Sequence, residues 1–446
     1  MANTQTIKPL NLTESHRLEA EARQCIAGFT QTMMKKPEQF CQGRFPVYLA
    51  QGQGAEVTDV DGNHYIDFIC GLGANALGHN HPAVMDAINT NLAKGLLHSL
   101  PGALEVETAQ TLIDIIPSAE MVRFFKTGAD ANSAAVRLAR YVTQREKIIT
   151  VGYNGWHDHY MFDTPGVPQV VAELTTRFPL FAPTDEAPLL EFVQNHGSEH
   201  AALLLSVPYT RQLSPAFVQQ LRALCHSQGV LFVMDEVVTG FRLALGGAQE
   251  FFGIEADLVT LSKGLAAGMP LSAVTGKRAL LSQMEALQVS TTFGGELLSL
   301  AVCNAALKHY RRSQCLSHIA QLGAALKEGV NAVAKELGAP LKIVGYDAIP
   351  MFMFAPNPVE HARIAAPFVG AMAEQGILLR RDVNFICAAH TVAHIEATIA
   401  AVRNALLQMQ ANGVFDAVAG APKTEVICGY QERPEIRQLP LLLIDD

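Results

Sequence analysis

Several signatures that would assign a function at once are missing from this sequence. The eight cysteines are scattered and form no CxxC pair, which favours a reducing compartment over a disulfide scaffold or a zinc site. No segment approaches the ~18 apolar residues that a membrane span requires. The N-terminus lacks the basic start and apolar stretch of a signal peptide. We therefore expect a cytoplasmic protein without a membrane partner.

Signatures of nucleotide and nucleic-acid binding are lacking as well. The chain contains no GxxxxGK[ST] loop and no GxGxxG following a strand, which argues against a P-loop hydrolase and a dinucleotide-dependent enzyme. The formal net charge is −9 and no run of lysine or arginine stands out, so nucleic acid is not an expected partner. With 49% hydrophobic and 17% charged residues among 446, the composition is that of a globular chain of two or three structural units.

Predicted helices and short apolar runs alternate from about residue 80 onward. Apolar runs separated by helices indicate a mainly parallel sheet covered on both faces, and hence an α/β fold. The expected helices cover residues 82–96, 103–116, 131–145, 187–196, 214–228, 298–312 and 313–337. The apolar runs cover 148–151, 202–207, 230–236, 258–263 and 271–276.

The two ends of the chain have a different pattern. Residues 11–40 are expected to be helical, and residues 45–70 to form β structure around a DVDGN turn. A second α+β unit is expected over about 340–412, and the apolar run in RQLPLLLIDD could be a small strand or a docking segment. We expect an N-terminal segment (1–75) that is part of a small domain, a large domain (76–335), and a C-terminal part of the small domain with a tail (336–446).

One predicted helix start could hold an anionic group. FFKTGADANSAAVRLARYV (124–142) runs from an apolar strand end into a helix. Helix starts present N–H groups without intrahelical acceptors, and Gly128 would let a phosphate approach the backbone while Thr127 adds a hydroxyl. The alternative is an ordinary capped helix with Asp130 in its first turn.

An acid and a lysine end two of the predicted strands. VLFVMDE ends in Asp235 and Glu236, and LVTLSK ends in Lys263. Ligands of open α/β sheets bind beyond the carboxyl ends of the strands. A carboxylate there could pair with a protonated pyridine nitrogen, and a lysine could form a Schiff base with an aldehyde cofactor. The alternatives are a magnesium-binding acid and a solvent-exposed lysine.

An aromatic residue and several histidines lie near the predicted strand ends. Trp156, the single tryptophan, could stack on a planar heterocycle, and the alternative is an ordinary core or surface aromatic. His157 and His159, like His79 and His81, have an HxH spacing without further ligands. We do not expect a metal there.

Seven segments, in this order along the chain, resemble the class III aminotransferase family. The family depends on pyridoxal 5'-phosphate (PLP) and has the fold-type I architecture, and within it the chain resembles the glutamate-1-semialdehyde aminomutase-like branch most. The resemblance covers roughly residues 40–410. The segments are GQGAEVTDVDGNHYIDF (52–68), LGHNHPAV (77–84), TGADANSAAVRLAR (127–140), GWHDHY (155–160), DEVVTGFR (235–242), DLVTLSKGLAAGMPLSAVTG (257–276) and TTFGGELLSLA (291–301).

This resemblance implies a role for each matching position. Lys263 corresponds to the Schiff-base lysine and general base, Asp235 to the partner of the pyridinium nitrogen, and Val237 to the residue packed under the ring. The remaining cofactor-binding positions are Thr127, Gly128 and Ala129 for the phosphate, Trp156 and the following His157 at the ring, and Thr292 for the phosphate of a neighbouring subunit. The Thr292 position implies a homodimer with shared active sites.

The departures from the family's pattern bear on the reaction. The family's glutamate and proline after the strand at 201–207 are replaced by Ser206-Val207-Pro208, which puts the usual role of that glutamate in doubt. The mutase gating run is replaced by 291–296, TTFGGE. We therefore expect a two-substrate transamination rather than an aminomutase reaction, with a small semialdehyde aminotransferase or the aminomutase itself as alternatives.

The substrates are expected from the family and from arginines that could hold carboxylates. Glutamate is the expected donor by family analogy. Arg380 and Arg381, and more weakly Arg44 and Arg242, are candidates for a substrate carboxylate, since guanidinium groups bind carboxylates in a fork. The branch includes enzymes that aminate sugar-like carbonyls, among them an oxidised eight-carbon sugar acid of lipopolysaccharide biosynthesis (8-amino-3,8-dideoxyoctulosonate type). A different PLP reaction and a catalytically silent PLP-fold protein remain open.

Overall fold

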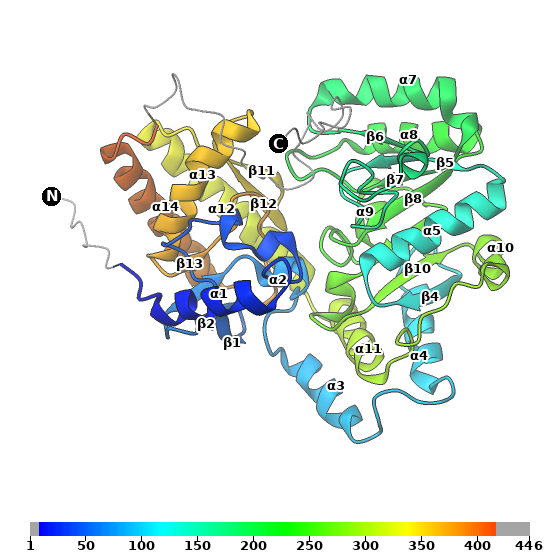
Figure 1. The fold of residues 1–446 in the computed structure, drawn as a ribbon, viewed down its shortest axis with the longest axis horizontal. Helices are drawn as coiled ribbons and strands as arrows, with labels where there is room; N and C mark the ends of the chain where they lie inside the picture. The colour runs from blue at the N-terminus through cyan, green and yellow to red at the C-terminus, as the bar shows by residue number, and fades with distance from the viewer. Residues whose placement is uncertain (1–8, 416–446) are drawn as a thin grey trace. The chain divides into compact units, whose positions relative to one another are not determined.

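The computed structural model describes residues 9–415, which divide into two compact units (Figure 1). Among the described residues, the first unit contains 9–73, 77–81 and 317–415, and the second contains 74–76 and 82–316. The apolar run in RQLPLLLIDD lies outside the described residues. Within residues 9–415, no helix combines the length and the apolarity that a membrane crossing requires.

The second unit is built on a seven-stranded sheet with the order β4-β10-β9-β8-β7-β5-β6. Strands β9, β8, β7, β5 and β6 pair in parallel, while β10 runs antiparallel to both β9 and β4. The strands are β4 Met121–Phe125, β5 Lys147–Val151, β6 Thr175–Phe178, β7 His200–Leu205, β8 Leu231–Glu236, β9 Leu258–Leu261 and β10 Ser272–Gly276. The predicted mainly parallel sheet is therefore confirmed.

The central strands β7, β8 and β9 are mostly apolar because helices cover both faces of the sheet, and β8 becomes charged only at its end, Asp235-Glu236. Helix α5 packs on β7, β9 and β10, and α8 and α9 pack on β8. The helices and 3-10 helices (η) of this unit are α3 Pro82–Leu92, α4 Ala103–Ile113, α5 Gly128–Thr143, α6 Gln169–Ala172, η3 Pro183–Asp185, α7 Glu186–His196, η4 Gly197–Glu199, α8 Pro215–Ser227, α9 Gly247–Phe252, η5 Lys263–Ala266, α10 Arg278–Leu281, η6 Ser282–Leu287 and α11 Leu297–Arg312.

Helix α5 approaches the sheet closely because its buried face carries alanines. Ala131, Ala134 and Ala135 are buried in one cluster with Val233 of β8 and Val274 of β10. Small side chains on a helix face let the backbone lie near the strands, so the start of α5 reaches the carboxyl ends of β8 and β9. The amino end of this helix is therefore placed where the sheet presents its polar residues.

The first unit combines a four-stranded sheet, a β-hairpin and long helices. Its sheet has the order β1-β2-β3-β13, with β13 parallel to β3, and β11 pairs with β12. The elements are α1 Thr13–Cys25, η1 Met33–Lys35, η2 Pro37–Gln39, β1 Leu49–Gln53, β2 Glu56–Asp59, β3 His64–Asp67, α2 Cys70–Gly73, α12 Cys315–Leu337, β11 Lys342–Tyr346, β12 Ile349–Met353, α13 Pro358–Ala373, β13 Ile377–Leu378 and α14 Val392–Ala411.

The predicted helix over residues 11–40 is wrong beyond Cys25. Helix α1 ends there, and Gly28 and Phe29 follow with positive φ angles of 72° and 73°. The left-handed region is costly for residues with a Cβ and stops a right-handed helix. Pro37 then permits only the short turn η2, because a proline is tolerated at a helix start but not inside a helix.

Candidate functional site

Asp235 lies near the end of β8, and Lys263 lies just after β9. These two strands are parallel neighbours in the sheet of the second unit. Asp235 pairs with Thr260 in the register of β8 and β9, and η5 begins at Lys263, two residues after β9 ends. Because parallel strands present their carboxyl ends at the same edge, both side chains belong to one edge of the sheet. The positive charge of Lys263 also acts on the pKa of Asp235, which requires the two groups to be close.

Three nitrogen donors hold the carboxylate of Asp235. Its Oδ2 accepts from Nδ2 of Asn132 and Nδ2 of Asn154, each at 2.8 Å, and its Oδ1 accepts from the Val237 backbone N–H at 3.0 Å. The Oδ1 of Asn132 in turn accepts from Thr260 Oγ1 at 2.6 Å, which fixes the orientation of the Asn132 amide. Asp235 is therefore a rigid acceptor.

Burial dominates the electrostatics of Asp235. Only 3% of the residue is exposed. Burial raises the pKa of Asp235, while the hydrogen bonds from Asn154, Val237 and Asn132 and the charge of Lys263 oppose the rise without cancelling it. A buried carboxylate that keeps acceptor capacity on Oδ1 is stabilised by a cationic N–H donor placed against it. This donor set fits the protonated ring nitrogen of a pyridine.

The backbone at Lys263 is held in an uncommon conformation. Its φ of 45° lies in the left-handed region, which costs a residue with a side chain about 1–3 kcal/mol. The turn is fixed on both sides: Tyr310 Oη donates to the carbonyl of Gly264 at 2.8 Å, and Ser262 Oγ donates to the carbonyl of Leu271 at 3.0 Å. The direction in which the half-buried Lys263 side chain leaves the backbone is thereby set by its neighbours.

The start of α5 is both a capped helix and a cradle of backbone donors. Thr127 Oγ1 accepts from the Asp130 N–H at 3.1 Å, and an Asp130 oxygen accepts from the Thr127 N–H at 2.9 Å. This is the capped helix that the sequence left open as an alternative. The N–H groups of Gly128 and Ala129 stand at the helix start, where a helix supplies no acceptor of its own. Ser272 Oγ anchors the turn by donating to the Thr127 carbonyl at 2.6 Å.

Gly128 lies directly against Val237, the residue that follows the acid pair of β8. A Cβ built on Gly128 would come within 2.7 Å of Cγ2 of Val237. Real Cβ atoms do not approach so closely, so the two positions touch and only a glycine fits. The structure therefore brings the predicted phosphate turn, Val237 and Asp235 into one place.

Replacing Gly128 with alanine should weaken the binding of a phosphate-bearing cofactor. Overpacking typically costs about 1–3 kcal/mol, which corresponds to a roughly 5- to 150-fold higher Kd if the cost falls on the bound state. Equilibrium dialysis with PLP measures this. Gly102→Ala is the matched control, since Gly102 also precedes a helix and a Cβ there meets nothing nearer than 3.8 Å. Equal affinity of G128A and G102A would contradict the cradle.

The loop after β5 places Trp156 and His157 beside the start of α5. A Cβ on Gly155 would come within 2.8 Å of the Ala129 Cβ, so the loop lies on the helix start. Trp156 is 68% exposed, and its ring meets the ring of His157 edge-on at 5.0 Å. Nδ1 of His157 is 2.7 Å from Ser133 Oγ. Trp156 thus presents an open ring at the same edge of the unit as the cradle.

His159 lines the same pocket as His157. The pocket is also lined by Asp130, Arg137 and Thr291. Burial first, and then the positive charges of Arg140 and His157, lower the pKa of His159 to about 4. Its imidazole is consequently neutral near neutral pH, and it is 3.2 Å from Ser133 Oγ.

Thr292 lies in an exposed segment ahead of α11. The segment is packed through Gly294, whose Cβ would come within 2.9 Å of the Phe124 carbonyl in β4. Thr292 and Phe293 are both exposed, the latter by 58%. The role that the resemblance gives to Thr292, a contact with a second subunit, stays a prediction.

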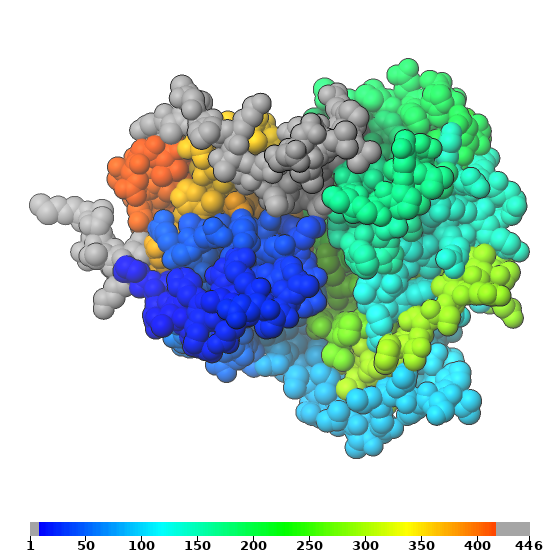
Figure 2. Space-filling view, viewed as in Figure 1, coloured from blue at the N-terminus to red at the C-terminus, as the bar shows by residue number. Residues whose placement is uncertain are grey.

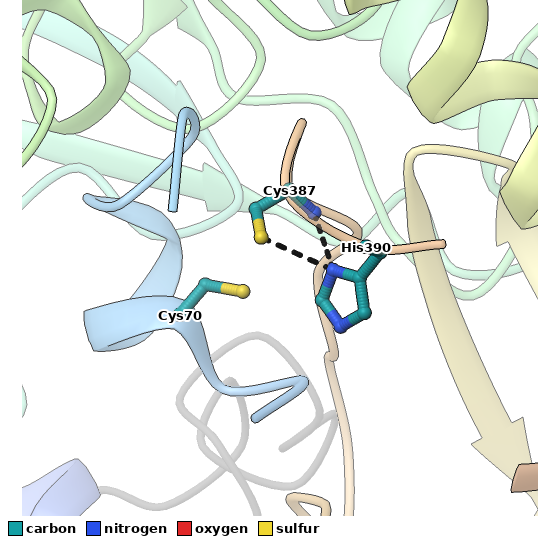
Figure 3. Close-up of side chains that lie close together, drawn as sticks. All are labelled: Cys70, Cys387 and His390. Atoms are coloured by element: carbon teal, nitrogen blue, oxygen red, sulfur yellow. Dashed lines mark hydrogen bonds between the residues drawn. The ribbon is translucent and has the colours of Figure 1, made fainter. Parts of the chain in front are cut away.

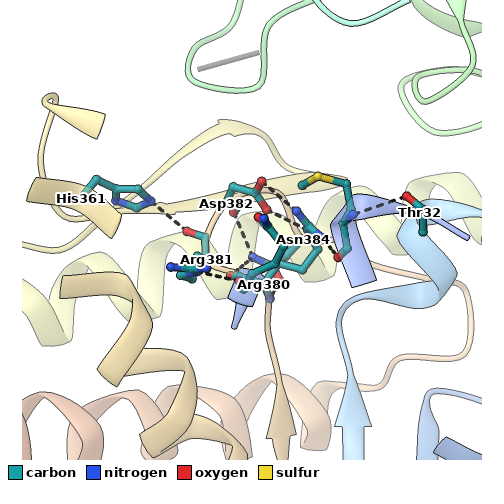
Figure 4. A network of polar contacts seen from close by, with 8 residues as sticks. Thr32, His361, Arg380, Arg381, Asp382 and Asn384 are labelled. Carbon is teal, nitrogen blue, oxygen red and sulfur yellow. Dashed lines mark hydrogen bonds and ion pairs between the residues drawn. The ribbon is translucent and has the colours of Figure 1, made fainter. Parts of the chain in front are cut away.

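The candidate substrate arginines Arg380, Arg381 and Arg44 lie in the first unit and are engaged with partners of the same chain, as Figure 4 shows for Arg380 and Arg381. Arg380 forms a two-point ion pair with Asp382 at 2.8 and 2.9 Å and donates to the Met34 carbonyl at 2.7 Å. Arg381 donates to the carbonyls of Glu38 and Gln39. Arg44 forms a two-point ion pair with Glu374 at 2.7 and 2.6 Å. A substrate carboxylate would have to compete with these partners.

Replacing Arg380 with alanine should destabilise the fold as well as any substrate contact. Arg380 and Asp382 are only 5% and 8% exposed, and removing one member of a buried pair costs about 3–5 kcal/mol. Burial raises the pKa of Asp382, but the charge and hydrogen bonds of Arg380 outweigh this and leave it below its ordinary value. The stabilisation is therefore full above the unfolded-state pKa of about 3.9 and is lost as the pH falls through the lower folded-state pKa.

Urea unfolding of the wild type and R380A at pH 7 and below pH 4 measures this difference. The gap between the two proteins should shrink at the acidic pH. Arg403→Ala is the control, because Arg403 pairs with Glu336 on the surface and such pairs contribute little. A stable R380A with only a raised KM would favour the substrate role instead.

Residues that the sequence reasoning missed complete the site around Asp235. Asn132, Asn154 and Thr260 form the network that holds the carboxylate. One signal was available for Asn132: it is a polar residue on the alanine-rich buried face of α5, only 1% exposed. A buried amide needs partners, so its position indicated a polar network. Asn154 and Thr260 gave no comparable signal.

A family comparison agrees with this geometry. The model of the family described as "Aminotransferase class-III" matches residues 41–185 and 210–403. The chain belongs to the class III aminotransferases. The predicted family, its glutamate-1-semialdehyde aminomutase-like branch and the fold-type I architecture are thereby confirmed.

Curated relatives of this aminotransferase include both mutases and transaminases. It is 32% identical over 400 residues to a glutamate-1-semialdehyde 2,1-aminomutase of Desulfatibacillum aliphaticivorans, with 82% of this chain and 93% of the relative covered. It is 33% identical over 356 residues to the 2'-deamino-2'-hydroxyneamine transaminase of Streptomyces kanamyceticus, with 79% and 89% covered.

Solved structures share the fold of this aminotransferase over most of its length. The FumI protein of Sphingopyxis sp. MTA144, solved with PLP, superposes with a TM-score of 0.84 at 25% identity, covering 91% of this chain and 98% of that one. A transaminase solved with PLP bound gives a TM-score of 0.82 at 27% identity, covering 91% and 99%.

Proposed function

We propose that this aminotransferase uses pyridoxal phosphate to move an amino group from an amino acid donor to a polar aldehyde or ketone. The observation that carries the proposal is the buried Asp235, clamped by Asn132 and Asn154 at the strand end beside Lys263. The cofactor is the one named for FumI and for the second solved transaminase. A catalytically silent protein would have no need to keep a buried carboxylate and a strained lysine together.

The chain's own residues divide the chemistry among them. Bound PLP supplies an aldehyde for the amino group and a ring that accepts electrons. Asp235 keeps the ring nitrogen protonated, because its carboxylate is buried and rigid. Lys263 Nζ would hold the aldehyde carbon of the cofactor, and its amine, when free, could carry a proton as a general base. Val237 and Trp156 with His157 would contact the ring.

The helix start of α5 holds the phosphate. The N–H groups of Gly128 and Ala129 point out of the helix, and the partial positive charge of the helix end favours an anion. Thr127 Oγ1 is already used as an acceptor by Asp130 N–H, and its own proton remains available as a donor. The close fit of Gly128 on Val237 keeps the backbone near enough for these contacts.

A second copy of the chain would complete the site. The segment from α3 to α4 (light blue) lies at the surface of the second unit in Figure 2. Its large apolar residues Leu92, Leu96, Leu97, Leu100 and Val106 are 42–79% exposed. An apolar patch of this kind marks an interaction site. We propose a homodimer in which Thr292 reaches the phosphate held by the other subunit. We also propose that both ends of the chain together form a small domain.

The carbonyl substrate is proposed to be polar. The Streptomyces kanamyceticus relative is named a 2'-deamino-2'-hydroxyneamine transaminase, and its hydroxylated substrate favours a polar carbonyl compound for this chain. Glutamate is the proposed donor, and an oxidised eight-carbon sugar acid of lipopolysaccharide is one acceptor to assay. The second candidate is a glutamate-1-semialdehyde 2,1-aminomutase, which the names of several relatives at 31–34% identity favour.

A labelled half-reaction tests the proposal. The purified protein is first mixed with 15N-glutamate alone, and the release of 2-oxoglutarate and loading of the label onto the protein are measured. The washed protein is then offered glutamate-1-semialdehyde, a small semialdehyde or oxidised sugars. Label in the product of the small semialdehyde or of an oxidised sugar supports transamination. Isomerisation of glutamate-1-semialdehyde without any donor would establish the mutase instead, and no amino transfer at all would overturn both.

A further inference from the structure

Three soft ligand groups meet in the interior of the first unit, outside the site described above. Cys70, Cys387 and His390 place their ligand atoms within 4.8 Å of one another (Figure 3). They are 2%, 1% and 1% exposed. Cys70 comes from α2, while Cys387 and His390 lie in the loop between β13 and α14, more than 300 residues later in the chain. The proposed transaminase chemistry uses none of them.

The loop between β13 and α14 arranges two of these ligands as a chelate. Cys387 and His390 are separated by two residues, a spacing with which a short turn can direct two side chains at one ion. Cys387 Sγ lies 3.1 Å from His390 Nδ1, and the turn is closed by the His390 N–H donating to the Cys387 carbonyl at 3.1 Å.

The histidine is in the form that binds metal. Nδ1 of His390 accepts the Cys387 backbone N–H at 3.0 Å, so this nitrogen is unprotonated and its lone pair, now used by that N–H, is the one that a metal ion would take over. The ring is held in place by Phe68, with centroids 4.5 Å apart. The backbone carbonyl of His390 is fixed by His318 at 2.8 Å. The orientation of the ligand is therefore set by packing rather than by a flexible surface loop.

Cys70 is brought to the chelate by a strained turn. Its φ is 48°, in the left-handed region, and Asp67 Oδ1 holds the turn by accepting from the N–H groups of Ile69 and Cys70. The Phe385 N–H donates to the Phe68 carbonyl at 2.8 Å, which ties the two segments together. Cys70 Sγ currently donates to the Asp67 carbonyl at 3.2 Å and contacts the Cys387 thiol.

We propose that Cys70, Cys387 and His390 bind a zinc ion that joins the two segments of the first unit. Two thiolates and a neutral imidazole leave a Zn²⁺ complex without net charge, which suits a buried site. Binding releases the two thiol protons, so the affinity should fall at acidic pH. With Zn–S near 2.3 Å and Zn–N near 2.0 Å, a tetrahedral ion needs Cys387 Sγ and His390 Nδ1 about 3.6 Å apart. The ion therefore takes the place of the present Nδ1 contacts after a small side-chain rotation.

Metal content and X-ray absorption of the full-length protein test this site without using activity. After exposure to zinc under reducing conditions and gel filtration, the wild type should retain about one zinc ion per chain. Cys70→Ser and Cys387→Ser should each lower this at least about ten-fold. Cys225→Ser is the matched control, because Cys225 is a fully buried cysteine of α8 and should change nothing.

The X-ray absorption spectrum of the wild type tests the site even if a variant fails to fold. Two sulfur neighbours near 2.3 Å and one nitrogen near 2.0 Å are the expected shell. A shell without sulfur, zinc that persists in C387S, or no zinc in the wild type would overturn the proposal. A Cys70–Cys387 disulfide that survives the reducing treatment and excludes the metal would also overturn it.

Discussion

Replacing Lys263 with alanine should reduce turnover on the order of 10⁴-fold or more, because it removes both the covalent anchor and the proton carrier. The lysine follows β9 in a left-handed turn that Tyr310 and Ser262 fix. The half-reaction with labelled glutamate measures the loss. Mass spectrometry after borohydride reduction should locate the cofactor on Lys263 in the wild type and nowhere in the variant.

Lys277→Ala provides the matched control for this prediction. Lys277 also follows a strand of the same sheet, β10, and its side chain caps no helix. Its loss should leave both turnover and the reduced adduct unchanged. Appreciable turnover by K263A, or an adduct on another lysine, would show that the catalytic amine lies elsewhere.

Replacing Asp235 with asparagine should lower kcat/KM by about 10²- to 10⁴-fold, since breaking a buried charge pair costs about 3–5 kcal/mol. Asn132 and Asn154 both donate to Oδ2, so the new amide must place its oxygen there. Its NH₂ group then occupies the Oδ1 position and faces the Val237 N–H. A ring N–H at that position would meet a second donor, and the proton would no longer be held.

Measuring the half-reaction at several pH values, on D235N and on a control variant, separates this electrostatic effect from a general loss of structure. Asp257→Asn is the control, because Asp257 Oδ2 also accepts a backbone N–H, from Phe232, but lies just before β9 begins. The D257N amide can still accept that bond. If D235N and D257N lose activity equally and in parallel with stability, the special role of Asp235 is wrong.

The sequence allowed the sheet and the acid–lysine pair to be predicted, for a simple physical reason. A parallel strand buried on both faces is apolar until it ends, so the charged residue that follows marks the edge where ligands bind. Asp235 and Lys263 stand at such ends. The direction of a strand could not be predicted in this way. The run LSAVTG indicates that β10 is buried but not that it runs antiparallel to β9.

Contacts between distant segments account for what the sequence did not reveal. Asn132 and Asp235 are joined by a 2.8 Å hydrogen bond, but nothing in either segment indicates the other. Arg380 is a different case, because its partner Asp382 is only two residues away. The RRD sequence could have indicated that this guanidinium is held within the chain.

The antiparallel strand β10 also imposes an order of events on the newly made chain. β4 pairs with β10, and Ser272 at the start of β10 fixes the Thr127 carbonyl in the phosphate turn. These partners leave the ribosome about 150 residues apart, which at ~5–20 residues per second is a delay of roughly 7–30 s. Until then β4 has an unpaired edge, and such edges invite aggregation. Chaperone demand during synthesis should therefore be greatest between the emergence of β4 and that of β10.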